Sequence, residues 1–148
     1  MYKINDCVIL NNYHVYQIIK NNQDKYTLTS FTSQDTIEVT SKQIIKALPT
    51  VEQINEVIER IPYIRTLQIE NEKYRQEIYQ KTISTFDEVD LIKIIKSVYL
   101  RRKRNKYHDY EEKYYHLAKN LFHEEVAVSL KMPLDTVEAY INEKVLEF

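Results

Sequence analysis

The chain has 148 residues and contains no glycine. Proteins use glycine for about 7% of their residues, because it adopts positive φ angles without a steric cost. Glycine-rich phosphate loops, dinucleotide-binding fingerprints and EF-hand calcium loops all depend on that freedom. The sequence therefore excludes these three kinds of site. It also predicts that other residues make the tight turns.

The composition is that of a globular protein, with 43% hydrophobic and 29% charged residues. One cysteine, Cys7, excludes an internal disulfide and a cysteine-based zinc site, and we expect it to be buried in a reducing compartment. No apolar run approaches the roughly 18 residues of a membrane span. We therefore expect a cytoplasmic protein without a membrane partner. The net charge of −1 predicts no nucleic-acid partner, although a local patch still could.

The first 48 residues have the pattern of short strands. Residues 36–40 alternate polar and apolar side chains, which is typical of a half-buried strand. Asn and Asp occupy the breaks, and we expect them to replace glycine in the turns because they tolerate left-handed backbone. Four or five strands joined by tight turns predict a small antiparallel barrel. The expected strands cover 2–10, 13–20, 26–31 and 36–40.

After Pro49 the apolar spacing becomes helical, and capping patterns mark the helix starts. Tyr74 is expected on the inward face with Leu67 and Ile78, and Tyr99 on the inward face of the following helix. The fold class is therefore α+β, with a β domain at 1–48 and a helical domain at 49–148. The expected caps pair Thr50 with Gln53, Thr85 with Glu88, Asp109 with Glu112, and Asp135 with Glu138. The expected helices cover 51–61, 63–82, 86–104, 110–131 and 136–147.

Catalytic chemistry is weakly represented. His116 and His123 share a helix face, with Glu112 one turn before His116, but no metalloprotease spacing is present. Isolated histidines on helices are usually solvated or structural. We therefore predict that the protein is not an enzyme and uses no metal or cofactor.

The most informative charge feature is a basic segment. Seven basic residues and no acidic residue lie between Ile92 and His108, and Tyr99 and Tyr107 flank the densest part. A helix dipole favours cations at a helix end, but this accounts for only two or three of them. The segment therefore predicts contact with phosphates or with an acidic partner. The seven residues are Lys93, Lys96, Arg101, Arg102, Lys103, Arg104 and Lys106.

A second pattern, from Ala127 to Ile141, has the apolar spacing of a helix-turn-helix motif with Pro133 in the turn. Lys131 stands where that motif prefers glycine. Glu138, Glu143 and Glu147 face a single Lys144 in the second helix, and DNA would repel this charge. A plain helical hairpin is the favoured interpretation, and a helix-turn-helix repressor remains an alternative.

The order and spacing of three segments resemble the CarD/CdnL family of bacterial transcription regulators. The segments are 2–9, the amphipathic helix 91–102 with its Arg-rich end, and 111–127. The resemblance implies a Tudor-like N-terminal domain, shared with transcription–repair coupling factors, that binds the β-subunit of RNA polymerase. It also implies a helical domain at the upstream edge of the transcription bubble. Together they would stabilise the open promoter complex without an enzymatic step, and we expect a monomer.

The resemblance also implies site residues, with two departures. The family has a wedging Trp where this chain has no aromatic residue, near Glu70, which leaves Tyr63 and Tyr74 as candidates. Glu38 stands where the family has a polymerase-contacting Arg. A protein–protein adaptor on the same fold, without a DNA wedge, is therefore a second alternative. The implied polymerase-binding residues are Thr36, Ile37, Glu38, Val39 and Thr40, and the implied DNA-binding residues are Lys73, Arg75, Lys96, Arg101, Arg102, Lys103, Arg104 and Lys106.

Overall fold

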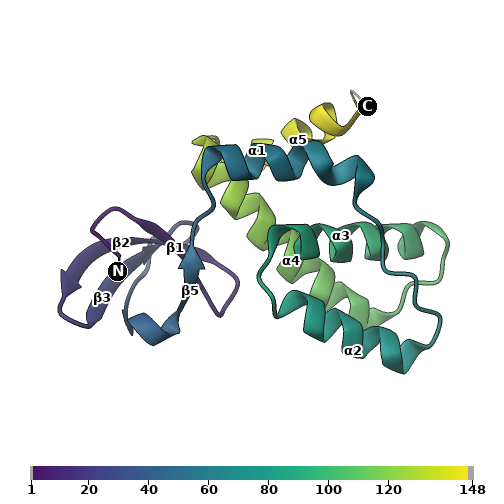
Figure 1. Cartoon of the computed structure of the whole chain (residues 1–148), viewed down its shortest axis with the longest axis horizontal. Helices are drawn as coiled ribbons and strands as arrows, with labels where there is room; N and C mark the ends of the chain where they lie inside the picture. Colours follow the sequence, from purple (N-terminus) through teal and green to yellow (C-terminus); the bar gives the residue numbers. More distant parts are fainter. Residues whose placement is uncertain (1, 147–148) are drawn as a thin grey trace.

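A computed structural model describes residues 2–146 of the chain, with side chains to Lys144. It confirms the α+β class: an antiparallel sheet is followed by helices (Figure 1). Glu147, predicted in the last helix, lies outside the described residues. The strands are β1 (Cys7–Leu10), β2 (Val15–Asn22), β3 (Lys25–Ser30), β4 (Thr36–Thr40) and β5 (Ile44–Ala47).

The five strands form an open sheet in the order β4-β3-β2-β1-β5. β4 and β5 are its two edges, and the short 3-10 helix η1 (Ser41–Gln43) connects them. Closure of the sheet into the predicted barrel is not observed. β4 has the bounds expected from its alternating pattern, whereas β1 is shorter than predicted and begins at Cys7.

The turns lie where the sequence predicts them, but the residues with positive φ differ from the prediction. In three of the turns the left-handed positions are Tyr13 (φ 65°), Gln23 (φ 58°) and Gln34 (φ 64°), rather than the neighbouring Asn or Asp residues. A left-handed residue other than glycine costs roughly 1–2 kcal/mol. Without glycine the chain accepts this cost in its turns, and surrounding contacts must offset it.

Five α-helices follow the sheet, and two of the predicted starts are wrong. α2 begins at Glu72 rather than at residue 63, because Pro62 lies in the short 3-10 helix η2 (Ile61–Tyr63) and no helix follows until the Asn71 cap. α5 begins after a third 3-10 helix, η3 (Leu134–Thr136), which contains the predicted cap Asp135. The helices are α1 (Val51–Arg60), α2 (Glu72–Ile83), α3 (Glu88–Lys103), α4 (Asp109–Leu130) and α5 (Val137–Leu146).

The helix caps correct the predicted pairs in part. The capping box of Thr50 and Gln53 is confirmed at the start of α1. α3 is capped by Asp87, whose side chain accepts from the Asp90 backbone N–H, rather than by Thr85. α4 is preceded by His108 and uses Glu111 rather than the predicted Asp109 and Glu112.

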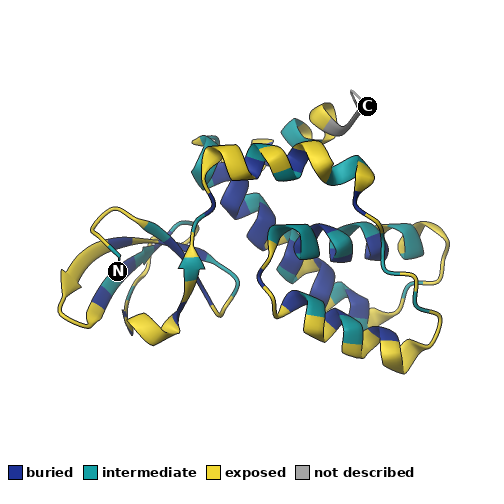
Figure 2. Cartoon of the chain, in the orientation of Figure 1, coloured by how far each residue is buried: buried dark blue, intermediate teal, exposed yellow. Residues whose placement is uncertain are grey.

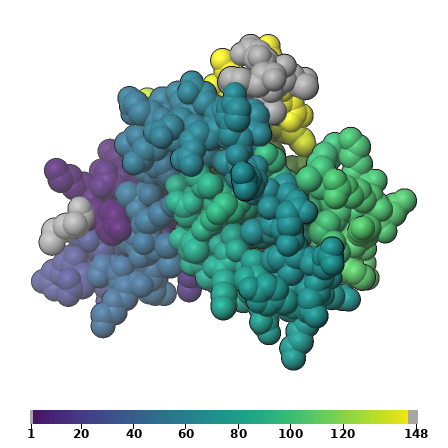
Figure 3. Space-filling model, turned by 45° about the vertical axis from the view of Figure 1, so that its right-hand side comes forward, coloured from purple at the N-terminus to yellow at the C-terminus, as the bar shows by residue number. Residues whose placement is uncertain are grey.

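α4 is the central helix and packs against each of the other four helices (Figure 1). Its buried face forms the helical core together with residues of α2 and α3 (Figure 2). Ile9 and Val15 of the sheet belong to this same core, because they point away from the neighbouring Val8 and Tyr16. The other face of the sheet has a separate apolar cluster. The two halves of the chain therefore share a core and form one continuous surface on the face seen in Figure 3.

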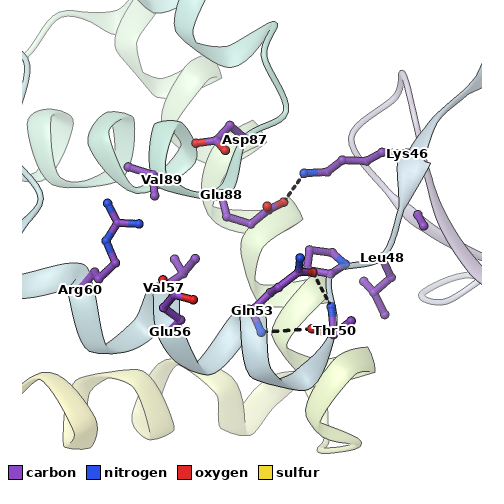
Figure 4. Close-up of a pocket in the computed structure, with 12 residues that line it drawn as sticks. Lys46, Leu48, Thr50, Gln53, Glu56, Val57, Arg60, Asp87, Glu88 and Val89 are labelled. Carbon is purple, nitrogen blue, oxygen red and sulfur yellow. Dashed lines mark hydrogen bonds and ion pairs between the residues drawn. The ribbon is translucent and has the colours of Figure 1, made fainter.

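Polar contacts reinforce the junction between the sheet and the helices, which we call the seam. Glu124 of α4 accepts from the Val15 backbone N–H at 3.1 Å and lies 2.8 Å from Nδ1 of His14. The Tyr13 and Phe86 rings stack with their centroids 4.4 Å apart. On the other side of the seam, Lys46 of β5 donates to Glu88 at 2.5 Å, beside a hollow of about 530 Å³ (Figure 4).

Glu125 is the exception among the buried groups of the seam. It is fully buried, and neither carboxylate oxygen has a hydrogen-bond partner among the described residues. Burial and the nearby Glu88 carboxylate raise the pKa of Glu125 well above its usual range, although Lys46 opposes this effect. A buried carboxyl group in such surroundings holds its proton when the unfolded chain would release it.

We expect Glu125→Gln to be more stable than the wild type at about pH 8, with the advantage shrinking towards about pH 4.3, the ordinary glutamate pKa. The raised pKa means that the native state binds more protons than the unfolded state, so wild-type stability falls as pH rises through this window. The amide of Gln cannot titrate. Urea unfolding measured as a function of pH provides the test.

Glu59→Gln, at an exposed position of α1, is the matched control for this experiment. It changes the same charge without entering the seam. A Glu125→Gln protein whose stability difference from the wild type does not vary with pH would contradict this account of the seam.

Candidate nucleic-acid interface

The basic residues predicted to bind phosphate concentrate where α3 ends. Residues 101–106, which we call the basic turn, complete α3 and lead into α4. Asn105 is left-handed (φ 58°), and the Lys106 backbone N–H donates to the Arg101 carbonyl at 2.9 Å. This closure satisfies helix-end carbonyl groups and fixes the path of the turn.

Glu111 of α4 holds the basic turn from below. Its fully buried carboxylate accepts from Arg101 Nε at 2.6 Å, from the Tyr79 hydroxyl at 2.8 Å and from the His108 backbone N–H at 2.8 Å. Burial and Glu111 raise the pKa of Tyr79, so this hydroxyl remains a donor. Three donors compensate for the cost of burying the carboxylate.

Arg102 occupies an intermediate position between structure and surface. Its guanidinium lies 4.9 Å from the Tyr107 ring centroid and 4.7 Å from the Tyr115 ring centroid, and it pairs with Glu112 at 3.1 Å. The side chain is nevertheless 43% exposed. It is therefore held in place and still presents charge to solvent.

Lys103, Arg104 and Lys106 form the exposed part of the basic turn. No ion pair or side-chain hydrogen bond holds any of these three side chains among residues 2–146. A groove of about 410 Å³ lies beside them, between the turn and the irregular segment 66–70. Arg104 and Lys106 line this groove, so an anion placed there would meet cations that have no other partner.

Three of the predicted DNA-binding cations are engaged internally instead. Arg75 is only 4% exposed, and its guanidinium donates to the carbonyls of Ile69 and Glu70, so the prediction that it contacts DNA is wrong. The Lys96 ammonium donates to the carbonyls of Ile61 and Ile64 at 2.7 and 2.6 Å and fixes the end of α1 on α3. Arg101, 17% exposed, is committed to Glu111. Burial lowers the pKa of Lys96.

The exposed aromatic residues differ from the expected set. Tyr74 is 53% exposed at the start of α2, beside exposed Lys73, rather than inward with Ile78 as the helical pattern predicted. Tyr63 is 73% exposed in η2. Tyr99, predicted inward, is 54% exposed, because α3 turns this face away from the core one turn before the basic turn. Both wedge candidates are therefore at the surface.

The predicted polymerase-binding strand lies at an edge of the sheet. β4 pairs only with β3 within the described part of the chain, so its other side is open to a partner. Val39 is buried and Ile37 packs against the sheet cluster. Thr36, Glu38 and Thr40 are exposed on the opposite face.

The histidines are placed singly. His116 pairs with Glu112 on α4, whereas His123 lies farther along the helix without joining them. No group of three metal-ligating side chains is present within residues 2–146. Within the same residues, no helix has the length and apolar character needed to cross a membrane.

The buried glutamates of α4 are the important residues that the sequence pattern missed. Glu124 and Glu125 lie inside the apolar run from Leu121 to Ala127, and that flanking pattern was the only available signal of their burial. Glu111 resembled an exposed residue of a helix start. Its pairing with Arg101 requires the tertiary fold.

Comparison with known proteins adds no family assignment. No protein-family model matches the chain, and no curated protein shows significant similarity to it.

Proposed function

We propose that this protein is a non-enzymatic transcription regulator that bridges RNA polymerase and promoter DNA. The sheet would bind the polymerase β-subunit through β4, as a Tudor-like domain, and the basic turn would bind DNA at the upstream edge of the bubble. The bridge would stabilise the open complex. The resemblance of segments 2–9, 91–102 and 111–127 to the CarD/CdnL family supports this proposal.

The exposed cations of the basic turn carry the proposal. Lys103, Arg104 and Lys106 are held close together by a closed turn, yet their side chains have no acidic partner in the described chain. Neutralising phosphates releases the counterions condensed on DNA, which favours binding to such a patch. Phosphate contacts carry no sequence information, so we expect binding to many promoters. Arg102 adds a fourth, preoriented charge.

The open edge of β4 supports the polymerase contact. An edge strand presents unpaired backbone groups to which a partner strand can add. The exposed Glu38 would face this partner and select against an acidic surface. The partner surface of a polymerase suited to this chain would therefore be less acidic than the one that an Arg at position 38 would meet.

Both surfaces belong to one body, which makes bridging efficient. The seam buries Ile9 and Val15 in the helical core and adds the Glu124 contacts. Once one surface is bound, the other meets its target at a high effective concentration. Two modest contacts would then give a long-lived complex.

An adaptor function is the second candidate. The internal roles of Arg75, Lys96 and Arg101 leave fewer free cations than the sequence predicted, which favours a partner other than DNA. The helix-turn-helix alternative is less favoured. Lys131 adopts the left-handed conformation (φ 55°) at the turn, but the exposed side of α5 carries Glu138 and Glu143.

Replacing Lys103, Arg104 and Lys106 together by Ala should weaken binding to forked promoter DNA. Each lost phosphate contact should remove about 0.9 from the slope of log K against log salt concentration. The loss should be similar for unrelated DNA sequences. Fluorescence anisotropy at a series of salt concentrations measures both quantities.

The control replaces Lys20, Lys25 and Lys42, three exposed lysines of the sheet region, by Ala. It removes an equal charge from another surface and should leave the slope near its wild-type value. If the basic-turn variant melts normally and binds DNA with an unchanged slope, the DNA part of the proposal fails and the adaptor function is favoured.

The full-length protein should capture the RNA polymerase β-subunit from a lysate of its own host. Glu38→Arg should weaken that capture, because it reverses the charge on an exposed position of β4, and should improve capture of a β-subunit with an acidic docking surface. Quantitative pull-down with both polymerases tests this.

Glu52→Arg, at an exposed position of α1, makes the same charge change away from β4 and serves as the control. Equal capture by the wild type and Glu38→Arg with both polymerases would place the contact elsewhere. Failure of the wild type to capture any polymerase would remove this half of the proposal.

A further inference from the structure

A groove of about 420 Å³ lies between α3, α4 and α5, away from the surfaces discussed above. α5 packs against α1 and α4, so α3 and α5 stand apart with part of α4 between them. Each helix presents one face, because the lining positions follow helical spacing. The volume lies in the range of small-molecule sites, about 300–1,000 Å³.

The walls of this groove are apolar and aromatic. Ile92 and Phe122 are buried at its base, and Tyr115 is nearly buried. Tyr99 is 54% exposed and also lines the groove. Exposed apolar surface of this kind is typical of binding sites, and aromatic walls favour a flat ring.

The polar groups that line the groove have unused hydrogen-bonding capacity. Two carbonyl groups occupy the Lys96 ammonium, which leaves one of its three N–H donors. His123 is half-buried and has no hydrogen-bond partner among the described residues. Burial and Lys119 lower the pKa of His123, so it offers a neutral donor and acceptor.

The charges in the groove select the anion. Lys96 and Lys119 contribute two positive charges and Glu138 one negative charge, which leaves one positive charge with His123 neutral. Lys119 and Glu138 form an ion pair at 3.2 Å at the exposed rim. A phosphate monoester carries about −1.5 to −2 at pH 7 and would exceed this balance, whereas a carboxylate matches it.

We propose that this groove binds a small aromatic carboxylate, with the ring on the apolar base and the carboxylate towards Lys119 and Lys96. Glu138 would compete with the ligand for Lys119. The inference does not depend on the proposed transcriptional role, because it uses different residues.

The test uses the full chain and 2-naphthoate as the probe, with calorimetry for affinity and amide chemical shifts for location. We expect saturable 1:1 binding that shifts residues of α3, α4 and α5 around the groove. Lys119→Gln should weaken binding about fivefold, as for loss of a partly exposed ion pair. Glu138→Gln should strengthen binding, because it removes the competing charge.

Two controls make the result specific. Lys113→Gln removes a positive charge from an exposed position of α4 outside the groove and should leave the affinity near its wild-type value. The uncharged 2-naphthamide should bind more weakly than 2-naphthoate. Absence of saturable binding at millimolar 2-naphthoate, or changes of the same sign in Lys119→Gln and Glu138→Gln, would overturn the proposal.

Discussion

Three buried glutamates of α4 determine how the rest of the structure is arranged. A buried carboxylate is costly unless donors surround it or it keeps its proton. Glu111 meets the first condition with Arg101, Tyr79 and the His108 N–H, and this fixes the basic turn. Glu124 meets it with the Val15 N–H and His14, and this fixes the sheet. Glu125 meets the second condition beside Glu88.

This arrangement makes α4 the element that relates the two candidate surfaces. Glu111 and Glu124 are 13 residues apart in one helix, which corresponds to about 20 Å at 1.5 Å per residue. The helix packs against every other helix, and its far end joins the core that includes Ile9 and Val15. The basic turn and the sheet are therefore held in a fixed relation, which is the property that a bridging protein would need.

The sequence predicted the features that local patterns determine. The α+β class, the bounds of β4 and the Thr50–Gln53 capping box follow from alternation and local hydrogen bonding. It could not predict which cations are free. Arg75 and Lys103 look alike in a sequence, but the burial of Arg75 depends on the path of residues 64–71, where a helix was expected.

The positive-φ turns and the exposed tyrosines show the same limit. Turn positions follow from breaks in the pattern, but the residue that becomes left-handed depends on strand register, and Tyr13 is held there by stacking on Phe86. The lifetime of the open promoter complex tests the bridging account most directly. Wild-type protein should lengthen it, and the variant with Ala at 103, 104 and 106 should not, although that variant still binds polymerase. An unchanged lifetime with the wild type, or equal lengthening by both proteins, would contradict the account.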